Sequence, residues 1–236
     1  MTTTGPHTTK TKRRRKAQLS NFDQTTISSA LRLLESLPSE RLRIDAKQYA
    51  TGYLALRHLI RDNIDFRNHQ ELLAASYAVY GWMPTILKKF ENIGVLSNFI
   101  LRVKPLPLAE AAEAVRDEVT SNDGQALQAL NNSVVGTSKL LHFVRPDLFP
   151  IWDSRIAELF RFRNASHNTP AAYLGYFELV HAWCSSANTF PESLRQILTN
   201  ESPEGDPISH IRLTEYCLFL ASVTQYGGGS ERSQEE

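Results

Sequence analysis

Apolar residues recur at intervals of three and four along most of the chain from residue 20 onward. The first such stripe is Ile27, Leu31 and Leu34, and Pro38 follows it. This spacing predicts a helix with one face toward a core, and the proline marks its end. Further helices are predicted around Tyr49–Ile60, Leu73–Tyr80, 94–103, 107–119, Ser138–Phe143, Arg155–Phe162, Tyr173–Cys184 and Leu213–Leu220.

Evidence for strands is poor. No stretch of four to eight residues alternates cleanly between apolar and polar positions, so no pair of strands joined by a hairpin turn is indicated. No period of 20–50 residues repeats, so a solenoid is not indicated. We therefore predict an all-α fold, a compact multi-helix bundle. We expect a disordered basic tail at 1–19, a single helical domain at 20–225 and a flexible Gly/Glu-rich tail at 226–236.

The composition is that of an ordinary soluble globular protein: 236 residues, of which 42% are hydrophobic and 22% are charged. Two cysteines, Cys184 and Cys217, cannot build a disulfide framework or a four-thiolate metal site. No run approaches the roughly 20 apolar residues of a membrane span, and no signal-peptide stretch is visible. We expect a cytoplasmic protein without a metal or another cofactor.

The net charge of +1 hides an asymmetry between the N-terminus and the rest of the chain. Residues 1–16 contain no acidic residue and six basic ones, among them Arg13, Arg14 and Arg15. Without these six charges the remaining chain carries −5. A basic arm of this kind adds affinity for polyanions through counterion release, so we expect the tail to contact nucleic acid phosphates.

The most informative segment is 131–160. A turn at Val134–Gly136 is expected to precede an amphipathic helix, and such a helix start exposes backbone N–H groups that bind phosphate. We therefore assign a phosphate-binding role to Gly136, Thr137, Ser138 and Lys139. A proline-rich loop over 146–150 follows. Asp153 then stands where it can cap the next helix through its carboxylate.

This order of elements resembles the helix-hairpin-helix core of the base-excision DNA glycosylases. In that family the hairpin holds the DNA backbone, and the aspartate that opens the following helix takes part in cleaving the glycosidic bond. By position, Gly136 matches the second half of the hairpin turn, and Asp153 matches the catalytic aspartate. Ser133 replaces the first hairpin glycine, and Ser138 occupies the place of the Schiff-base lysine. The resemblance therefore implies a monofunctional hydrolase and not a lyase.

A second resemblance covers more of the chain. The segments SKLLHFVRPDLFPIWDSRI, YGWMPTIL and ISHIRLTEYCLF are similar to a group of bacterial proteins of unknown function, which implies no activity.

Several residues have two interpretations. Arg145 and Arg155 belong to a basic strip that is either a phosphate-binding face or a solvated surface. Phe149 and Trp152 either stack on an extruded base or lie in the core. Arg212 and Glu215, spaced i, i+3, are predicted to form a structural ion pair.

Two functions remain open from the sequence. The first is DNA binding with a glycosylase-like hairpin and Asp153 as the catalytic residue. The alternative is a non-enzymatic helical scaffold that binds a protein partner.

Overall fold

The computed structural model describes residues 22–38, 52–83, 85–162, 164–186, 190–199 and 208–226. All regular structure in these ranges is helical, and they contain no strand, which confirms the predicted all-α fold. The predicted tail at 1–19 lies outside the described residues, as does all of the predicted C-terminal tail except Tyr226.

The helices follow one another with short connections. In chain order they are α2 (Gln24–Glu35), an unlabelled helix over 52–63, α4 (His69–Trp82), α5 (Ile93–Val103), α6 (Leu108–Ser121), the short 3-10 helix η1 (Ala126–Gln128), α7 (Val134–Val144), α8 (Ser154–Leu159), the 3-10 helix η2 (Asn164–His167), α9 (Pro170–Ser185), α10 (Glu192–Thr199) and α11 (His210–Tyr226).

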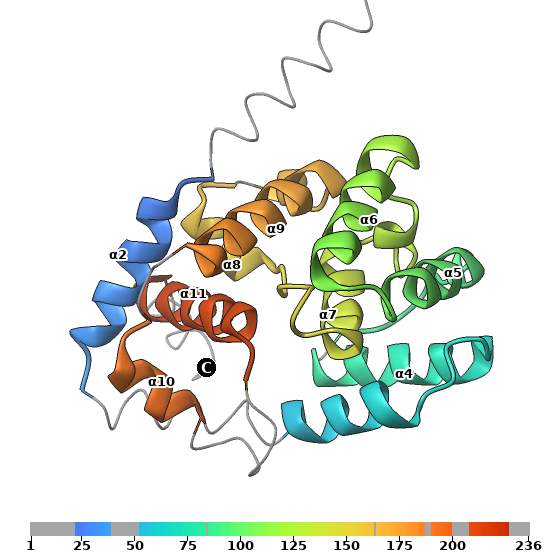
Figure 1. Ribbon diagram of the computed structural model, residues 1–236, viewed down its shortest axis with the longest axis horizontal. Coiled ribbons are helices and arrows are strands. Elements are labelled where there is room, and N and C mark those ends of the chain that lie inside the picture. Colours follow the sequence, from blue (N-terminus) through green and yellow to red (C-terminus); the bar gives the residue numbers. More distant parts are fainter. Residues whose placement is uncertain are drawn as a thin grey trace, which may run out of the picture.

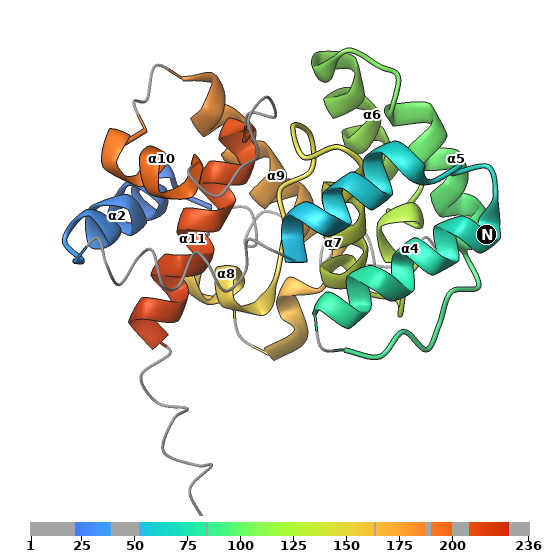
Figure 2. The ribbon, with the colours of Figure 1, turned by 90° about the horizontal axis from the view of Figure 1, so that it is seen from below.

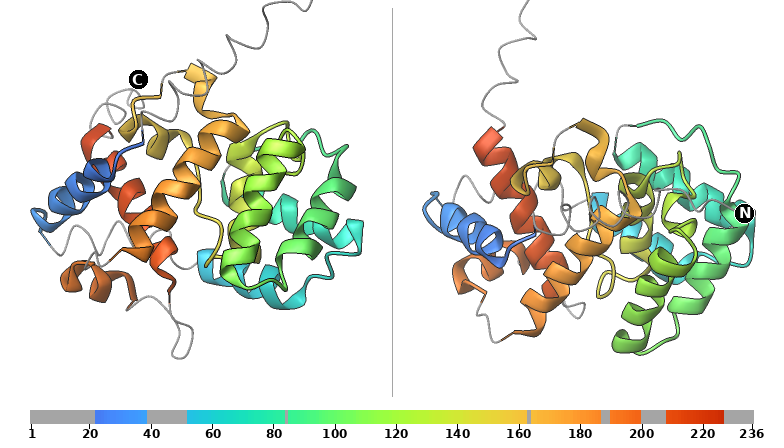
Figure 3. Two further views of the ribbon diagram at one scale, coloured as in Figure 1. Left: turned by 45° about the horizontal axis from the view of Figure 1, so that its top comes forward. Right: turned by 90° about the horizontal axis from the view of Figure 1, so that it is seen from above.

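The helices form two groups (Figure 1). One group contains α4, α5, α6 and α7, and the other contains α2, α8, α10 and α11. Helix α9 runs between them and contacts α6 on one side and α11 on the other (Figure 3). The N-terminal helix α2 packs against α11, so the two ends of the described chain belong to the same group (Figure 2).

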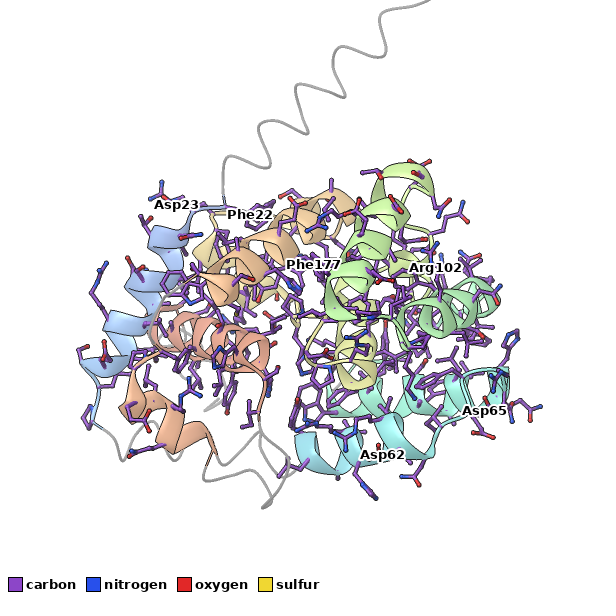
Figure 4. All side chains as sticks on the ribbon, viewed as in Figure 1. Phe22, Asp23, Asp62, Asp65, Arg102 and Phe177 are labelled. Atoms are coloured by element: carbon purple, nitrogen blue, oxygen red, sulfur yellow. The ribbon has the colours of Figure 1, made fainter. Side chains whose placement is uncertain are left out.

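The start of α2 is fixed by one aromatic and one acidic residue (Figure 4). The Phe22 ring packs against Trp152, Phe160 and Phe162, with ring centroids 5.2–6.1 Å apart. The Asp23 carboxylate caps the helix by accepting from the backbone N–H of Thr25 at 2.9 Å. These contacts hold α2 close to the loop that leads into α8.

The structure corrects three details of the predicted helices. Residues 134–136 form the first turn of α7 and not a separate hairpin turn, because Ser133 already serves as its N-cap. Helix α8 ends at Leu159, three residues before the predicted end. In α4 the buried apolar face is Leu72, Ala75, Val79 and Tyr80, whereas Tyr77, which continues the predicted Leu73–Tyr80 spacing, is 48% exposed.

Candidate functional site

A pocket of about 230 Å³ lies where the two groups of helices meet. The end of α4 contributes Trp82 and its C-cap Met83, and α7 contributes Lys139. The opposite side comes from α8, from α11 and from the loop that joins α7 to α8. The remaining lining residues are Ile151, Asp153, Ile156, Arg212, Glu215, Tyr216 and Phe219. Aromatic and aliphatic walls thus enclose two acidic and two basic side chains.

Asp153 has two roles at this pocket. Its Oδ1 accepts from the backbone N–H of Ile156 at 2.9 Å and so caps α8, as predicted. Its Oδ2 lies 3.9 Å from Nζ of Lys139, and both side chains are largely buried. The capping bond fixes the carboxylate on the first turn of a helix, so Oδ2 keeps a constant position in the pocket wall.

The second charged pair of the pocket is Arg212 and Glu215, which form the predicted ion pair one turn apart on α11. The guanidinium group lies between two aromatic rings, 4.1 Å from the Tyr53 centroid and 4.6 Å from the Tyr216 centroid. Cation–π contacts of this kind help to hold a buried cation. Both side chains of the pair are buried, and both line the pocket.

Glu215 also fixes the loop before α8. Its Oε2 accepts from the backbone N–H of Ile151 at 3.1 Å, two residues before Asp153. Burial raises the pKa of Glu215 from its ordinary value of 4.5 to about 7; Arg212 opposes this rise and the Asp153 carboxylate adds to it. The pocket therefore contains two carboxyl groups in different environments, one capping a helix and one fully buried.

The predicted phosphate-binding residues at the start of α7 lie in the interior. Thr137 and Ser138 are at most 1% exposed, and their hydroxyl groups bond to the backbone of Leu130 and Trp152. A methyl group at Gly136 would overlap the Tyr80 hydroxyl group, so this glycine is required for the packing of α4 on α7.

The N–H groups at the start of α7 already have partners within the protein. The Ser133 hydroxyl accepts from Gly136, and Oδ1 of Asn168 accepts from Val134 at 2.8 Å and more weakly from Val135. Side chains therefore occupy the place that a phosphate would take. Among the four residues predicted for this site, Lys139 alone lines the pocket.

The predicted basic residues differ in their surroundings. Arg145 is engaged within the protein: its guanidinium group binds Asp147 and the carbonyl groups of Val103 and Leu106. Arg155 is 42% exposed, lies two residues after Asp153 and pairs with Glu158 at 3.8 Å. Of these two residues, Arg155 is the more exposed, but it does not line the pocket.

The basic residues of the tail have no structural description. Arg13, Arg14 and Arg15 lie outside the described residues, so their predicted contact with nucleic acid stays a prediction.

The aromatic residues at the pocket are not those singled out from the sequence. Phe149 and Trp152 are fully buried and belong to the core, where Trp152 packs on Tyr176 with centroids 4.7 Å apart. Trp82, Tyr216 and Phe219 line the pocket instead. The pair of charges, Arg212 and Glu215, inside an otherwise apolar helix is the sequence feature that could have drawn attention to Tyr216 and Phe219.

A second, wider groove of about 620 Å³ lies between the start of α2 and the end of α11. Threonine and serine hydroxyl groups and Arg161 line it, and it contains no paired acid and base. Within the described part of the chain, no cluster of three or more His, Cys, Asp and Glu residues could hold a metal ion. No helix in that part is long and apolar enough to cross a membrane.

Comparison of the chain with protein-family models, with curated proteins and with solved structures found no match.

Proposed function

We propose that this protein binds nucleic acid, accepts an extruded base in the pocket and cleaves its N-glycosidic bond. The observation that carries the proposal is the meeting of Lys139 and Asp153, 3.9 Å apart, in the wall of a pocket with aromatic sides. Enzymes that act on a base within a duplex extrude it into such a pocket and stack it on aromatic or apolar side chains.

The size of the pocket supports a ligand as small as a single base. Its volume of about 230 Å³ lies below the range of about 300–1,000 Å³ that is typical of ligand sites. Trp82, Tyr216 and Phe219 offer flat surfaces, and stacking on such rings tolerates any base. The pocket thus suits a heterocycle, with the sugar and phosphate remaining outside.

Asp153 supplies the charge that this reaction needs. As the bond between C1′ and the base nitrogen breaks, positive charge develops on the sugar, and a fixed carboxylate nearby stabilises it. A water molecule then adds to C1′, and its proton leaves with the base, which gives a free base and an abasic sugar. Lys139 is already paired with Asp153, so we assign it to binding and orientation and not to attack on C1′.

The test compares wild type with Asp153→Asn and Asp153→Ala. Each protein is incubated with duplex oligonucleotides that carry a deaminated, an oxidised or an alkylated base, and abasic products are measured after alkaline cleavage. Both variants leave Lys139 without its carboxylate partner, but asparagine also caps helices, so the Asn variant should be about 1 kcal/mol more stable than the Ala variant. We expect base release to fall about 100-fold or more in both variants.

Two results would contradict the proposal. If wild type and Asp153→Asn release bases at equal rates, Asp153 is not a catalytic residue. Absence of both release and duplex binding in the wild type would favour the non-enzymatic scaffold that the sequence also allows.

A further inference from the structure

The loop over 85–90, which joins α4 to α5, presents an exposed apolar side chain followed by two basic residues. Ile86 is 72% exposed, more than any other large hydrophobic side chain in the described ranges. Lys88 and Lys89 are also exposed, whereas Leu87 between them and Ile86 is buried and anchors the loop to the core. The tip therefore combines an uncovered aliphatic side chain with two positive charges.

Hydrogen bonds from one asparagine hold this loop in a defined conformation. Oδ1 of Asn131 accepts from the backbone N–H groups of Lys88 and Lys89, at 2.7 and 2.8 Å. Its Nδ2 donates to the carbonyl of Ile86 at 2.9 Å, and its backbone N–H donates to the carbonyl of Lys89 at 2.7 Å. The exposure of Ile86 is thus imposed by a rigid turn and does not result from a loose segment.

The same loop lies next to the pocket. Met83 lines the pocket, and Ile86 follows three residues later, so their Cα atoms are at most about 11 Å apart. On its other side the loop is bonded to Asn131, three residues before α7, which carries Lys139. A duplex whose base occupied the pocket would therefore pass close to this loop.

We infer that the 85–90 loop is a wedge for double-stranded nucleic acid, with Ile86 entering the base stack and Lys88 and Lys89 contacting phosphates. The inference rests on the proposed function. Removing a base from the stack costs a few kcal/mol, and an apolar side chain inserted between base steps offsets part of that cost. The two lysines favour a polyanionic partner over a protein surface or a second copy of the chain.

Binding of the full-length chain to two DNA duplexes tests the inference. One duplex is intact, and the other carries a tetrahydrofuran abasic-site analogue flanked by 2-aminopurine, whose fluorescence reports unstacking. The variants are Ile86→Ala, the double variant Lys88→Ala/Lys89→Ala, and Leu108→Ala as a matched control, since Leu108 is 44% exposed on α6. All the substituted side chains are exposed, so thermal unfolding should be unchanged in each variant.

Each variant should affect a different quantity. Ile86→Ala should lose about tenfold in preference for the abasic-analogue duplex over the intact one, together with most of the 2-aminopurine signal. The double lysine variant should weaken binding to both duplexes alike and reduce the slope of log K against log salt by about 2. Leu108→Ala should behave as wild type.

The outcomes separate this inference from the proposed function. If Ile86→Ala and Leu108→Ala bind the abasic-analogue duplex equally well, the wedge is wrong, even where the wild type still releases bases. If Ile86→Asp converts an oligomer to a monomer in light scattering, the tip is a self-association surface and the inference is also overturned. A wild-type chain that binds neither duplex contradicts both proposals.

Discussion

The Tyr53 hydroxyl group lies 2.9 Å from Nε2 of His142 in the protein interior. The other ring nitrogen, Nδ1, lies 2.7 Å from the carbonyl oxygen of Phe149. A carbonyl group only accepts hydrogen bonds, so Nδ1 carries the proton and Nε2 accepts from Tyr53. The neutral ring is satisfied on both sides. Burial, with the nearby Arg212 and Arg57 charges, lowers the pKa of His142 well below its ordinary value of 6.5.

This lowered pKa predicts a loss of stability in mild acid. Below pH 6.5 the unfolded chain takes up a proton at His142 that the folded chain does not, so stability falls as the pH falls. Between pH 7.5 and 5.5 this residue should remove about 1 kcal/mol from the free energy of unfolding. His142→Asn, which retains a donor for Phe149, should be less stable overall but should lack this part of the pH dependence. Urea unfolding of both proteins at the two pH values measures the difference; parallel pH dependences would contradict the assignment.

The ion pair on α11 predicts a pH dependence of opposite sign. Arg212→Met leaves Glu215 buried without its cation, which raises the pKa of Glu215 beyond about 7. While Glu215 is protonated, its burial adds no charge penalty to folding. As the pH rises through the raised pKa, the folded protein must bury a negative charge, and stability is lost. Removal of one partner from a buried pair costs about 3–5 kcal/mol when the remaining group is charged.

We therefore expect Arg212→Met to be destabilised by about 3–5 kcal/mol at pH 8 and clearly less at pH 5. The double variant Arg212→Met/Glu215→Gln carries no charge at either position and should recover part of the loss at pH 8. Urea midpoints of the three proteins at both pH values provide the measurement. Equal destabilisation of Arg212→Met at pH 5 and pH 8 would show that packing and not charge governs the site.

Local spacing was sufficient to predict most of the α-helices of the described chain and some of their details, although α10 (Glu192–Thr199) was not predicted. The stripe Ile27, Leu31 and Leu34 forms the buried face of α2, and Asp153 caps α8 as predicted. Such features depend on residues within about one turn of each other. The buried face of α4 was predicted only in part: Tyr80 is buried, but Tyr77 is exposed. Apolar residues occupy two adjacent faces of that helix, and its packing on α5 and α7 decides which face is buried.

The pocket could not be assembled from the sequence. Lys139 and Asp153 are 14 residues apart, and their approach depends on how α7 and α8 are joined through the loop over 145–153. Trp82 and Tyr216 come from opposite parts of the chain. The interpretation of Gly136 as a turn residue was wrong for a related reason: it ignored the distant Tyr80 that packs against it.

The basic N-terminus predicts a strong salt dependence for any nucleic acid binding. A chain that starts at Gln18 lacks six positive charges, and each charge paired with a phosphate contributes about 0.9 to the slope of log K against log salt. The slope for a labelled duplex should therefore fall by up to about 5 on truncation. Fluorescence anisotropy over a salt titration measures both chains. The preference for an abasic-analogue duplex should remain in the truncated chain, because the pocket and the 85–90 loop are retained; loss of that preference would place recognition in the tail.

Gly136 and Tyr80 allow a direct test of the packing that joins α4 to α7. An alanine at position 136 would overlap the Tyr80 hydroxyl group, so Gly136→Ala should cost about 1–3 kcal/mol through overpacking. Tyr80→Phe removes that oxygen and a hydrogen bond of 3.4 Å to the carbonyl of Leu130. In the double variant the new methyl group would still lie 2.7 Å from Cζ of residue 80, so the rescue should be partial.

A matched control for this test lies in α4 itself. Gly81 has open space around it, so Gly81→Ala should stabilise the protein by about 0.5–1 kcal/mol through its helix propensity. Urea unfolding of the four variants gives the coupling between positions 80 and 136. Because Trp82 and Met83 lie two and three residues after Tyr80, Gly136→Ala should also weaken binding of an abasic-analogue duplex, and Tyr80→Phe should restore part of it. If the changes in unfolding free energy of the two single variants add up to that of the double variant, positions 80 and 136 are not coupled. In that case the close approach of Gly136 to Tyr80 does not position the α4 side of the pocket.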